Sequence, residues 1–218
     1  MIRISKAAGI MVALIAVASV ALAPTAGAMT FTSGASSGAI KITSTGTTIT
    51  LPSVLPAFGT GGKLECASVV EEGTYTSAAF SQIEVTPTYS GCKFFGYLNG
   101  AIQMNGCKYV YKGENASKAA MSIVCPAGKD ITIVVGNGFC VIHIAGGQTL
   151  GYVSFATNGS ASPDDVSRTL AVTGLFYRQT NGCVGEVEPP ARWNGEISGT
   201  STVQAFNVFG TQVSLTVD

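Results

Sequence analysis

The sequence predicts an all-β protein, an antiparallel β-sandwich or barrel of many short strands that is stabilised by disulfides. Three observations favour this fold class. Apolar residues recur with a period of two, glycine and asparagine interrupt the chain at short intervals, and all six cysteines follow an apolar leader. A period of two puts alternate side chains on opposite faces of a strand, and closely spaced short strands are typical of sandwiches and barrels.

The first 28 residues are expected to form a signal peptide. Arg3 and Lys6 precede an uncharged apolar run over residues 7–23, and Ala26-Gly27-Ala28 supplies the small residues that a signal peptidase reads. A membrane anchor would need about 20 apolar residues, which is more than this run provides. We therefore expect cleavage after Ala28 and one secreted domain over residues 29–218, in the extracellular space or the cell envelope.

The composition argues against two classes of partner. The chain has 12 basic and 12 acidic residues, is only 11% charged, and carries 23 Thr, 20 Ser and 27 Gly. Binding of phosphates requires clustered Lys and Arg, so the composition predicts no nucleic-acid partner. After removal of the leader, no apolar stretch is long enough to span a membrane.

The first expected element is a hairpin over residues 39–51. Ile40, Ile42, Ile49 and Leu51 alternate with polar residues around Ser44-Thr45-Gly46, which is typical of two strands and a turn. Further short strands are predicted at 82–86, 101–104, 108–111, 121–124, 131–135, 141–144 and 152–156. Turn residues separate nearly all of them, at Ser90-Gly91, Asn99-Gly100, Asn105-Gly106, Gly136-Asn137-Gly138, Gly146-Gly147 and Asn158-Gly159.

The last third of the chain is predicted to be β as well. The segment 162–165 has the residues of a helix start, a serine followed by proline and two aspartates. The β-branched residues that follow it favour a strand over residues 166–177 instead. Residues 197–205 and 212–217 are expected to form a final hairpin.

The six cysteines predict three disulfides, because their number is even and the chain is expected to be exported. Antiparallel pairing of residues 107–111 with 121–125 around a polar loop places Cys107 opposite Cys125. Sequence order alone suggests that Cys66 pairs with Cys92 and Cys140 with Cys183. No Cys-x-x-Cys motif is present and the single histidine lacks partners, so no metal site and no cofactor are expected.

No convincing catalytic residue emerges from the sequence. His143 is predicted to lie on the strand face opposite Cys140, Ile142 and Ile144, partly exposed and hydrogen-bonded to backbone. Acidic pairs occur at Glu71/Glu72, Asp164/Asp165 and Glu186/Glu188, but neighbouring residues of a strand point to opposite faces, and Glu186/Glu188 lie in an expected loop. The expected protein is not an enzyme, and a secreted hydrolase that uses His143 or an acidic pair is the alternative.

The single tryptophan is the one candidate ligand contact. Trp193 follows Pro189-Pro190 and precedes Asn194-Gly195, a context in which a loop could present its flat ring to a carbohydrate or cell-wall ligand. Packing in the core is the competing interpretation. The sequence thus favours a noncatalytic extracellular module with a structural or binding role.

Short motifs built from turns and cysteines resemble those of a group of secreted actinobacterial proteins of unknown function. The motifs are PTYSGC at 87–92, NGCKY at 105–109, CPAGK at 125–129 and CVIHI at 140–144. The resemblance extends from Phe31 to about Gly199. It implies an exported, β-rich protein with six cysteines, and it brings no catalytic residue, ligand or partner.

The leader and the cysteines together generate a prediction about the exported chain. Nonreducing mass spectrometry of the secreted protein should show a mature chain that begins at Met29 and contains no free thiol. An intact N-terminus, or two or more cysteines that react with an alkylating reagent, would contradict export with full oxidation.

Overall fold

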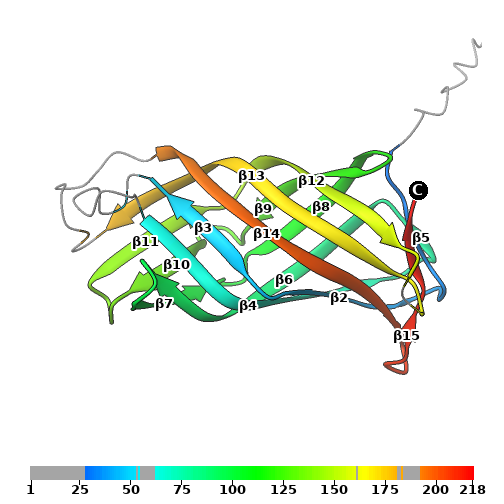
Figure 1. Ribbon diagram of the computed structural model, residues 1–218. Helices are drawn as coiled ribbons and strands as arrows, with labels where there is room; N and C mark the ends of the chain where they lie inside the picture. The colour runs from blue at the N-terminus through cyan, green and yellow to red at the C-terminus, as the bar shows by residue number, and fades with distance from the viewer. Residues whose placement is uncertain (1–27, 53, 55–61, 161, 181–182, 184–191) are drawn as a thin grey trace, which may run out of the picture.

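The computed structural model describes residues 28–52, 54, 62–160, 162–180, 183 and 192–218 (Figure 1). These residues form strands and turns, which confirms the predicted all-β class. The described part of the chain contains no helix long and apolar enough to cross a membrane. The strands are β1 (Phe31–Ser33), β2 (Gly38–Ser44), β3 (Thr47–Leu51), β4 (Gly62–Tyr75), β5 (Ala79–Phe80), β6 (Gln82–Phe94), β7 (Leu98–Gln103), β8 (Lys108–Asn115), β9 (Lys118–Val124), β10 (Asp130–Val135), β11 (Cys140–Ala145), β12 (Gln148–Asn158), β13 (Asp165–Thr180), β14 (Arg192–Asn207), β15 (Gln212–Val213) and β16 (Leu215–Val217).

The large sheet is antiparallel and closes on itself. Pairing of β4 with β6 and of β11 with β13 leaves no open end. Around one half of the molecule the ring runs β6-β8-β9-β12-β13-β14-β2-β4, and around the other half it runs β6-β7-β10-β11-β13-β14-β3-β4. Each ring has eight strands, a number whose interior is just wide enough for side chains to fill. The structure therefore has the closed arrangement rather than two facing sheets.

Four positions of this ring are occupied by two strands in line: β2 with β3, β7 with β8, β9 with β10, and β11 with β12. Both β2 and β3, for example, pair antiparallel with β14 on one side and with β4 on the other. They are not paired with each other in the described sheet. The hairpin expected over residues 39–51 is therefore wrong, because the chain continues in the same direction past Gly46.

The predicted turns have three outcomes. Ser90-Gly91 and Asn99-Gly100 form no turn, because they lie within β6 and β7 and pair with neighbouring strands. Gly136-Asn137-Gly138 and Asn158-Gly159 reverse the chain between neighbouring strands, as expected. Asn105-Gly106 and Gly146-Gly147 instead interrupt strands that continue in line. The segment 166–177 lies within β13, which confirms a strand there. The final hairpin is shorter than expected, since β14 and β15 pair at two positions before β16 leaves to join β1.

All three expected disulfides are present: Cys66–Cys92, Cys107–Cys125 and Cys140–Cys183. Cys66 lies directly opposite Cys92 in the β4–β6 ladder, and Cys107–Cys125 continues the β8–β9 register. A β-carbon at Gly146 would lie 2.8 Å from Cys125 Sγ, so only glycine fits where the β11–β12 interruption passes this disulfide. Disulfides of this kind persist outside the reducing cytosol.

A small sheet of β16, β1 and β5 covers the end of the ring where both described termini lie (Figure 1). Phe31 of β1 is fully buried, and its ring packs against Phe80 and Phe155 at centroid distances of 5.5 and 5.2 Å. Thr30 and Asp218 exchange backbone hydrogen bonds of 2.9 and 3.0 Å. The first and last strands of the domain thus close one end of the core together.

One ion pair lies at the centre of the interior, which is mainly apolar but also buries Ser44, Thr47, Gln148 and Gln179. Arg168 of β13 donates two hydrogen bonds to the Glu71 carboxylate of β4, at 2.8 and 2.7 Å, and a third to Tyr111 of β8 at 2.6 Å. Tyr111 donates to Glu71 at 3.0 Å, and Arg168 also donates to Ser201 at 2.7 Å. Glu71 and Arg168 are each 2% exposed. Three strands from different parts of the ring, β4, β8 and β13, therefore meet at one polar contact.

The electrostatics of this cluster favour a charged pair with a neutral tyrosine. Burial is the main cause that raises the pKa of Tyr111, and the Glu71 carboxylate raises it further. Burial by itself would lower the pKa of Arg168, but Tyr111 and Glu71 outweigh it and the net direction is upward. The Tyr111 hydroxyl therefore remains a donor and the guanidinium remains charged.

This cluster predicts a large asymmetry between single and double substitutions. Arg168→Met should lower the free energy of unfolding by about 3–5 kcal/mol, because it leaves a buried carboxylate without its partner. The double variant Glu71→Leu/Arg168→Met should recover most of that loss. Urea unfolding measures both. Arg178→Met, which removes a half-exposed guanidinium, is the control and should cost less than about 1 kcal/mol; equal losses in the control and in Arg168→Met would contradict the prediction.

Candidate functional site: an aromatic and polar patch on the outer face

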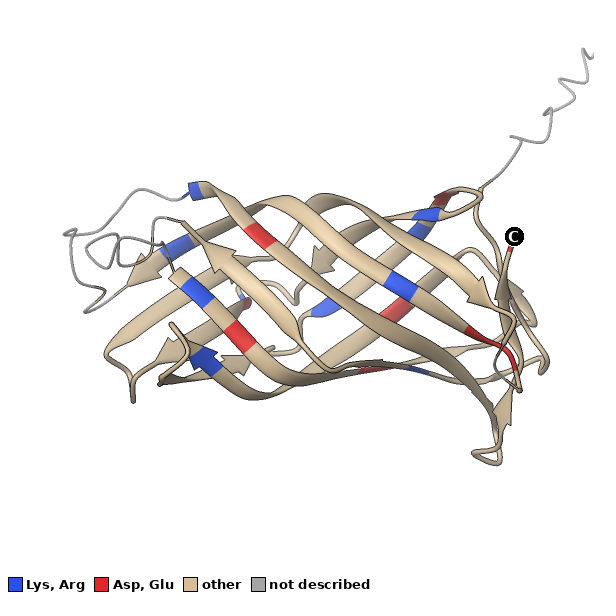
Figure 2. Ribbon diagram, viewed as in Figure 1, with Lys and Arg blue, Asp and Glu red and all other residues tan. Residues whose placement is uncertain are grey.

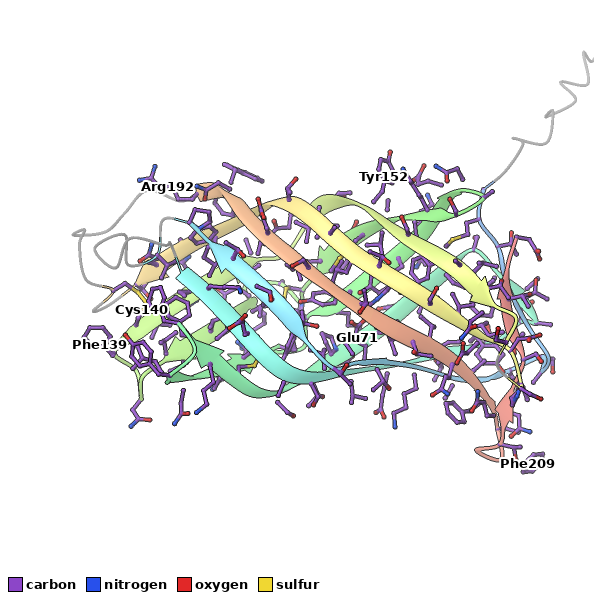
Figure 3. All side chains as sticks on the ribbon, viewed as in Figure 1. Glu71, Phe139, Cys140, Tyr152, Arg192 and Phe209 are labelled. Carbon is purple, nitrogen blue, oxygen red and sulfur yellow. A yellow bond between two sulfur atoms is a disulfide. The ribbon has the colours of Figure 1, made fainter. Side chains whose placement is uncertain are left out.

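The rarest side chains of the protein gather on the outer face of β10, β11, β13 and β14. The sequence contains one tryptophan and one histidine, and both lie here, with Phe176 and Arg178 between them. We call Trp193, Phe176, Arg178, His143 and Asp130 the outer patch. It belongs to the end of the molecule where Figure 3 shows Arg192 and Cys140, away from Phe209.

An exposed aromatic pair forms one side of the outer patch. The Trp193 residue is 66% exposed, and its ring centroid lies 4.3 Å from that of Phe176 with a tilt of 44°. Exposed tryptophans are unusual because burial of such a large ring stabilises a fold. The core packing considered for Trp193 is therefore wrong.

A β-bulge turns Trp193 outward. Leu175 pairs with Gly195 and Tyr177 pairs with Arg192, so Trp193 and Asn194 together lie opposite Phe176 alone. Simple alternation from the buried Gly195 would point Trp193 toward the interior. The extra residue breaks the alternation, and Trp193 and Asn194 are both exposed. Trp193 thus lies at the start of a strand, not on the expected loop, and the bulge sets its direction.

The strand register arranges the outer patch in two rows. One row is Thr132, His143 and Arg178, which lie side by side on β10, β11 and β13. In the other row Asp130 lies opposite Ala145. The Gln148 side chain joins this row to Phe176, because its Nε2 donates to the Ala145 and Phe176 carbonyls and its Oε1 accepts from the Phe176 backbone N–H.

His143 joins two neighbouring strands through its side chain. Its Nδ1 lies 2.9 Å from Asp130 Oδ2, and its Nε2 lies 3.0 Å from Thr180 Oγ1. A carboxylate accepts, so Nδ1 donates to Asp130, and in the tautomer with the hydrogen on Nδ1 the Nε2 atom accepts from the Thr180 hydroxyl. The expectation of a partly exposed strand histidine is right, but its partners are side chains and not backbone groups.

Asp130 is the most heavily bonded member of the outer patch. Its Oδ1 accepts from the Thr132 hydroxyl at 3.3 Å, and Asn105 donates to its backbone oxygen at 3.0 Å. The Asp130 carboxylate also lies 3.5 Å from an Arg178 nitrogen. These contacts hold the polar side of the outer patch in place.

The acidic pairs considered from the sequence do not join this site. Glu71 points into the core and Glu72 is exposed, as strand alternation predicts. Asp164 and Asp165 lie at the start of β13, the opposite end from Arg178. Glu186 and Glu188 lie outside the described residues. Within the described ranges, no three His, Cys, Asp or Glu side chains form a group that could hold a metal ion.

A second concave surface lies at the other end of the molecule. A groove of about 880 Å³ runs between β2, β4 and the β14–β15 hairpin, and its lining includes Tyr75, Phe206 and Val208. Its charged residues, Lys41 and Glu72, lie opposite each other in register. The groove therefore offers shape but few converging polar groups, whereas the outer patch offers both an aromatic surface and hydrogen-bonding groups.

The sequence did not single out Asp130, Phe176, Arg178 and Thr180. Alternation along β13 could have placed Phe176, Arg178 and Thr180 on one face. Their approach to Asp130, His143 and Trp193 depends on pairings between strands, which no local pattern specifies. No family model, curated protein or solved structure matches this chain.

Proposed function

We propose that this protein is a secreted, noncatalytic binding module whose outer patch binds a carbohydrate of the extracellular space or the cell wall. The observation that carries the proposal is the contact of the 66% exposed Trp193 with the partly exposed Phe176 on two paired strands, β14 and β13. An aromatic ring offers a large apolar surface with few rotatable bonds. Sugar rings carry a face of C–H groups that suits such a surface.

The polar side of the outer patch fits the same ligand class. Sugar hydroxyls both donate and accept hydrogen bonds, and the patch presents the Asp130 carboxylate, the His143–Thr180 pair and the Arg178 guanidinium beside the aromatic surface. Three disulfides and a closed sheet favour persistence outside the cell. These features support a role in binding without requiring any chemical step.

Substitution of the tryptophan tests this proposal. The mature protein should be retained in native gels containing soluble glycans, or on insoluble chitin, cellulose or peptidoglycan. Trp193→Ala should weaken that retention about tenfold, since an aromatic contact contributes up to about 1.5 kcal/mol. The matched control is Tyr152→Ala, which removes a 58% exposed ring elsewhere on the outer face (Figure 3). Equal retention of the two variants would contradict the proposal.

A hydrolase is the second candidate, and the chain from Asp130 through His143 to Thr180 favours it. The hydrogen-bond directions match those of an acid, a base and a hydroxyl nucleophile. All three side chains, however, lie on the convex outer face of a sheet. We therefore expect the contacts to join β10, β11 and β13 rather than to perform catalysis.

His143→Ala separates the two candidates. Under the binding proposal, any turnover of chromogenic esters by the purified protein should be the same in this variant. General base catalysis contributes about 10²- to 10⁴-fold, so the loss of a catalytic imidazole would be evident. A hundredfold decrease in turnover at an unchanged melting temperature would favour the hydrolase.

A further inference from the structure

We infer that the outer patch selects an anionic sugar, with Arg178 binding its carboxylate or phosphate group. This inference rests on the proposed function, because it assumes that the ligand sugar lies on Trp193 and Phe176. It adds the chemical class of that sugar and the direction in which it lies.

Arg178 is the arginine that projects from the outer face of the described strands. The chain has four arginines. Arg3 lies in the leader, Arg168 is buried at the core, and Arg192 pairs in register with the inward-facing Tyr177. Figure 2 shows that charged residues lie scattered over the strands rather than in a basic surface. Among the described residues, the arginine on this face lies two positions along β13 from Phe176, the ring that packs against Trp193.

The contact with Asp130 uses at most one side of the Arg178 guanidinium, which leaves N–H donors for a ligand. Its side chain is 55% exposed, and its contact within the described residues is a long one, 3.5 Å from Asp130 Oδ2. A guanidinium carries five N–H donors in a fork that matches carboxylate and phosphate oxygens. Among basic side chains it is the one best suited to grip such a group with two hydrogen bonds.

Among the described residues, Asp130 is the acid that contacts Arg178. Its carboxylate lies 3.5 Å from an Arg178 nitrogen and also accepts from Thr132 and His143, so it offsets part of the guanidinium charge and contacts only one side of the guanidinium fork. Glu196 is exposed on β14, three residues beyond Trp193 and on the side away from Arg178. The positive charge of Arg178 and the negative charge of Glu196 therefore orient an anionic sugar, with its acidic group toward Arg178 and away from Glu196.

The spacing suits a single sugar residue. Phe176 and Arg178 are two positions apart on the same face of β13, which separates their backbones by about 7 Å. A sugar ring stacked on the aromatic pair can span that distance with a carboxylate or phosphate substituent. The aromatic pair would then supply affinity for the ring, and Arg178 would supply selectivity for the charge.

Matched pairs of glycans test the inference and identify the source of the anion. Native gels would contain polygalacturonate or its methyl ester, and phosphomannan or neutral mannan. The unmodified protein should bind at least one charged polymer about tenfold more tightly than its neutral counterpart, and high salt should reduce the difference. Preference for polygalacturonate identifies a carboxylate, and preference for phosphomannan identifies a phosphate.

Three variants distinguish the role of Arg178 from general charge. Arg178→Gln should abolish the preference while leaving weaker binding to the neutral polymer, and Arg178→Lys should restore it only in part. Lys112→Gln removes an exposed cation from β8 and should change nothing. The inference, but not the proposed function, would be overturned by either of two results. One is that Arg178→Gln still prefers the charged polymer, and the other is that the unmodified protein binds charged and neutral polymers equally. Failure of every glycan to bind would overturn the proposed function as well.

Discussion

The contact of Glu71 with Arg168 and Tyr111 is the constraint on which the closed sheet depends. The three residues come from β4, β13 and β8, which lie apart around the ring, and they meet at its centre. A shift of any of these strands by one residue would turn its polar side chain outward and leave a buried charge or hydroxyl without a partner. The cost of such an unpaired group is several kcal/mol. The contact therefore fixes the register of β4, β8 and β13 together.

Many short apolar runs can form a ring of eight long strand positions because four of these positions each hold two short strands in line. The interruptions at Gly46, Asn105-Gly106 and Gly146-Gly147 let paired strands adjust to one another without reversing. The Cys107–Cys125 disulfide lies where two such interruptions pass each other, and Gly146 leaves room for its sulfur. Covalent and steric constraints thus hold the ring where its hydrogen-bond ladders are broken.

The same closure assembles the outer patch. Pairing of β11 with β13 brings His143 beside Arg178, and the bulge on β14 turns Trp193 outward next to Phe176. A binding surface on strands is more rigid than one on loops, so less conformational entropy is lost when a ligand binds. If the proposed carbohydrate binds here, this property would limit the entropy lost when the C–H face of a sugar ring packs on Trp193.

The sequence by itself determined the strand class and the Cys107–Cys125 disulfide, because alternation and the spacing of two cysteines around one loop are local properties of the chain. The other two disulfides were suggested by sequence order alone, and the strand pairing decided them. Alternation places Glu71 and Glu72 on opposite faces, but no strand was predicted between residues 51 and 82, so the structure decided that Glu71 is the one inside. Cys107 opposite Cys125 follows from one short loop. The tertiary structure decided whether Gly46 and Gly146-Gly147 would reverse a strand or merely interrupt it, since the same residues permit both. It also decided the direction of Trp193 and the meeting of Asp130, His143 and Thr180. These outcomes depend on pairing between distant strands, whose register is set by the closed sheet and its buried ion pair.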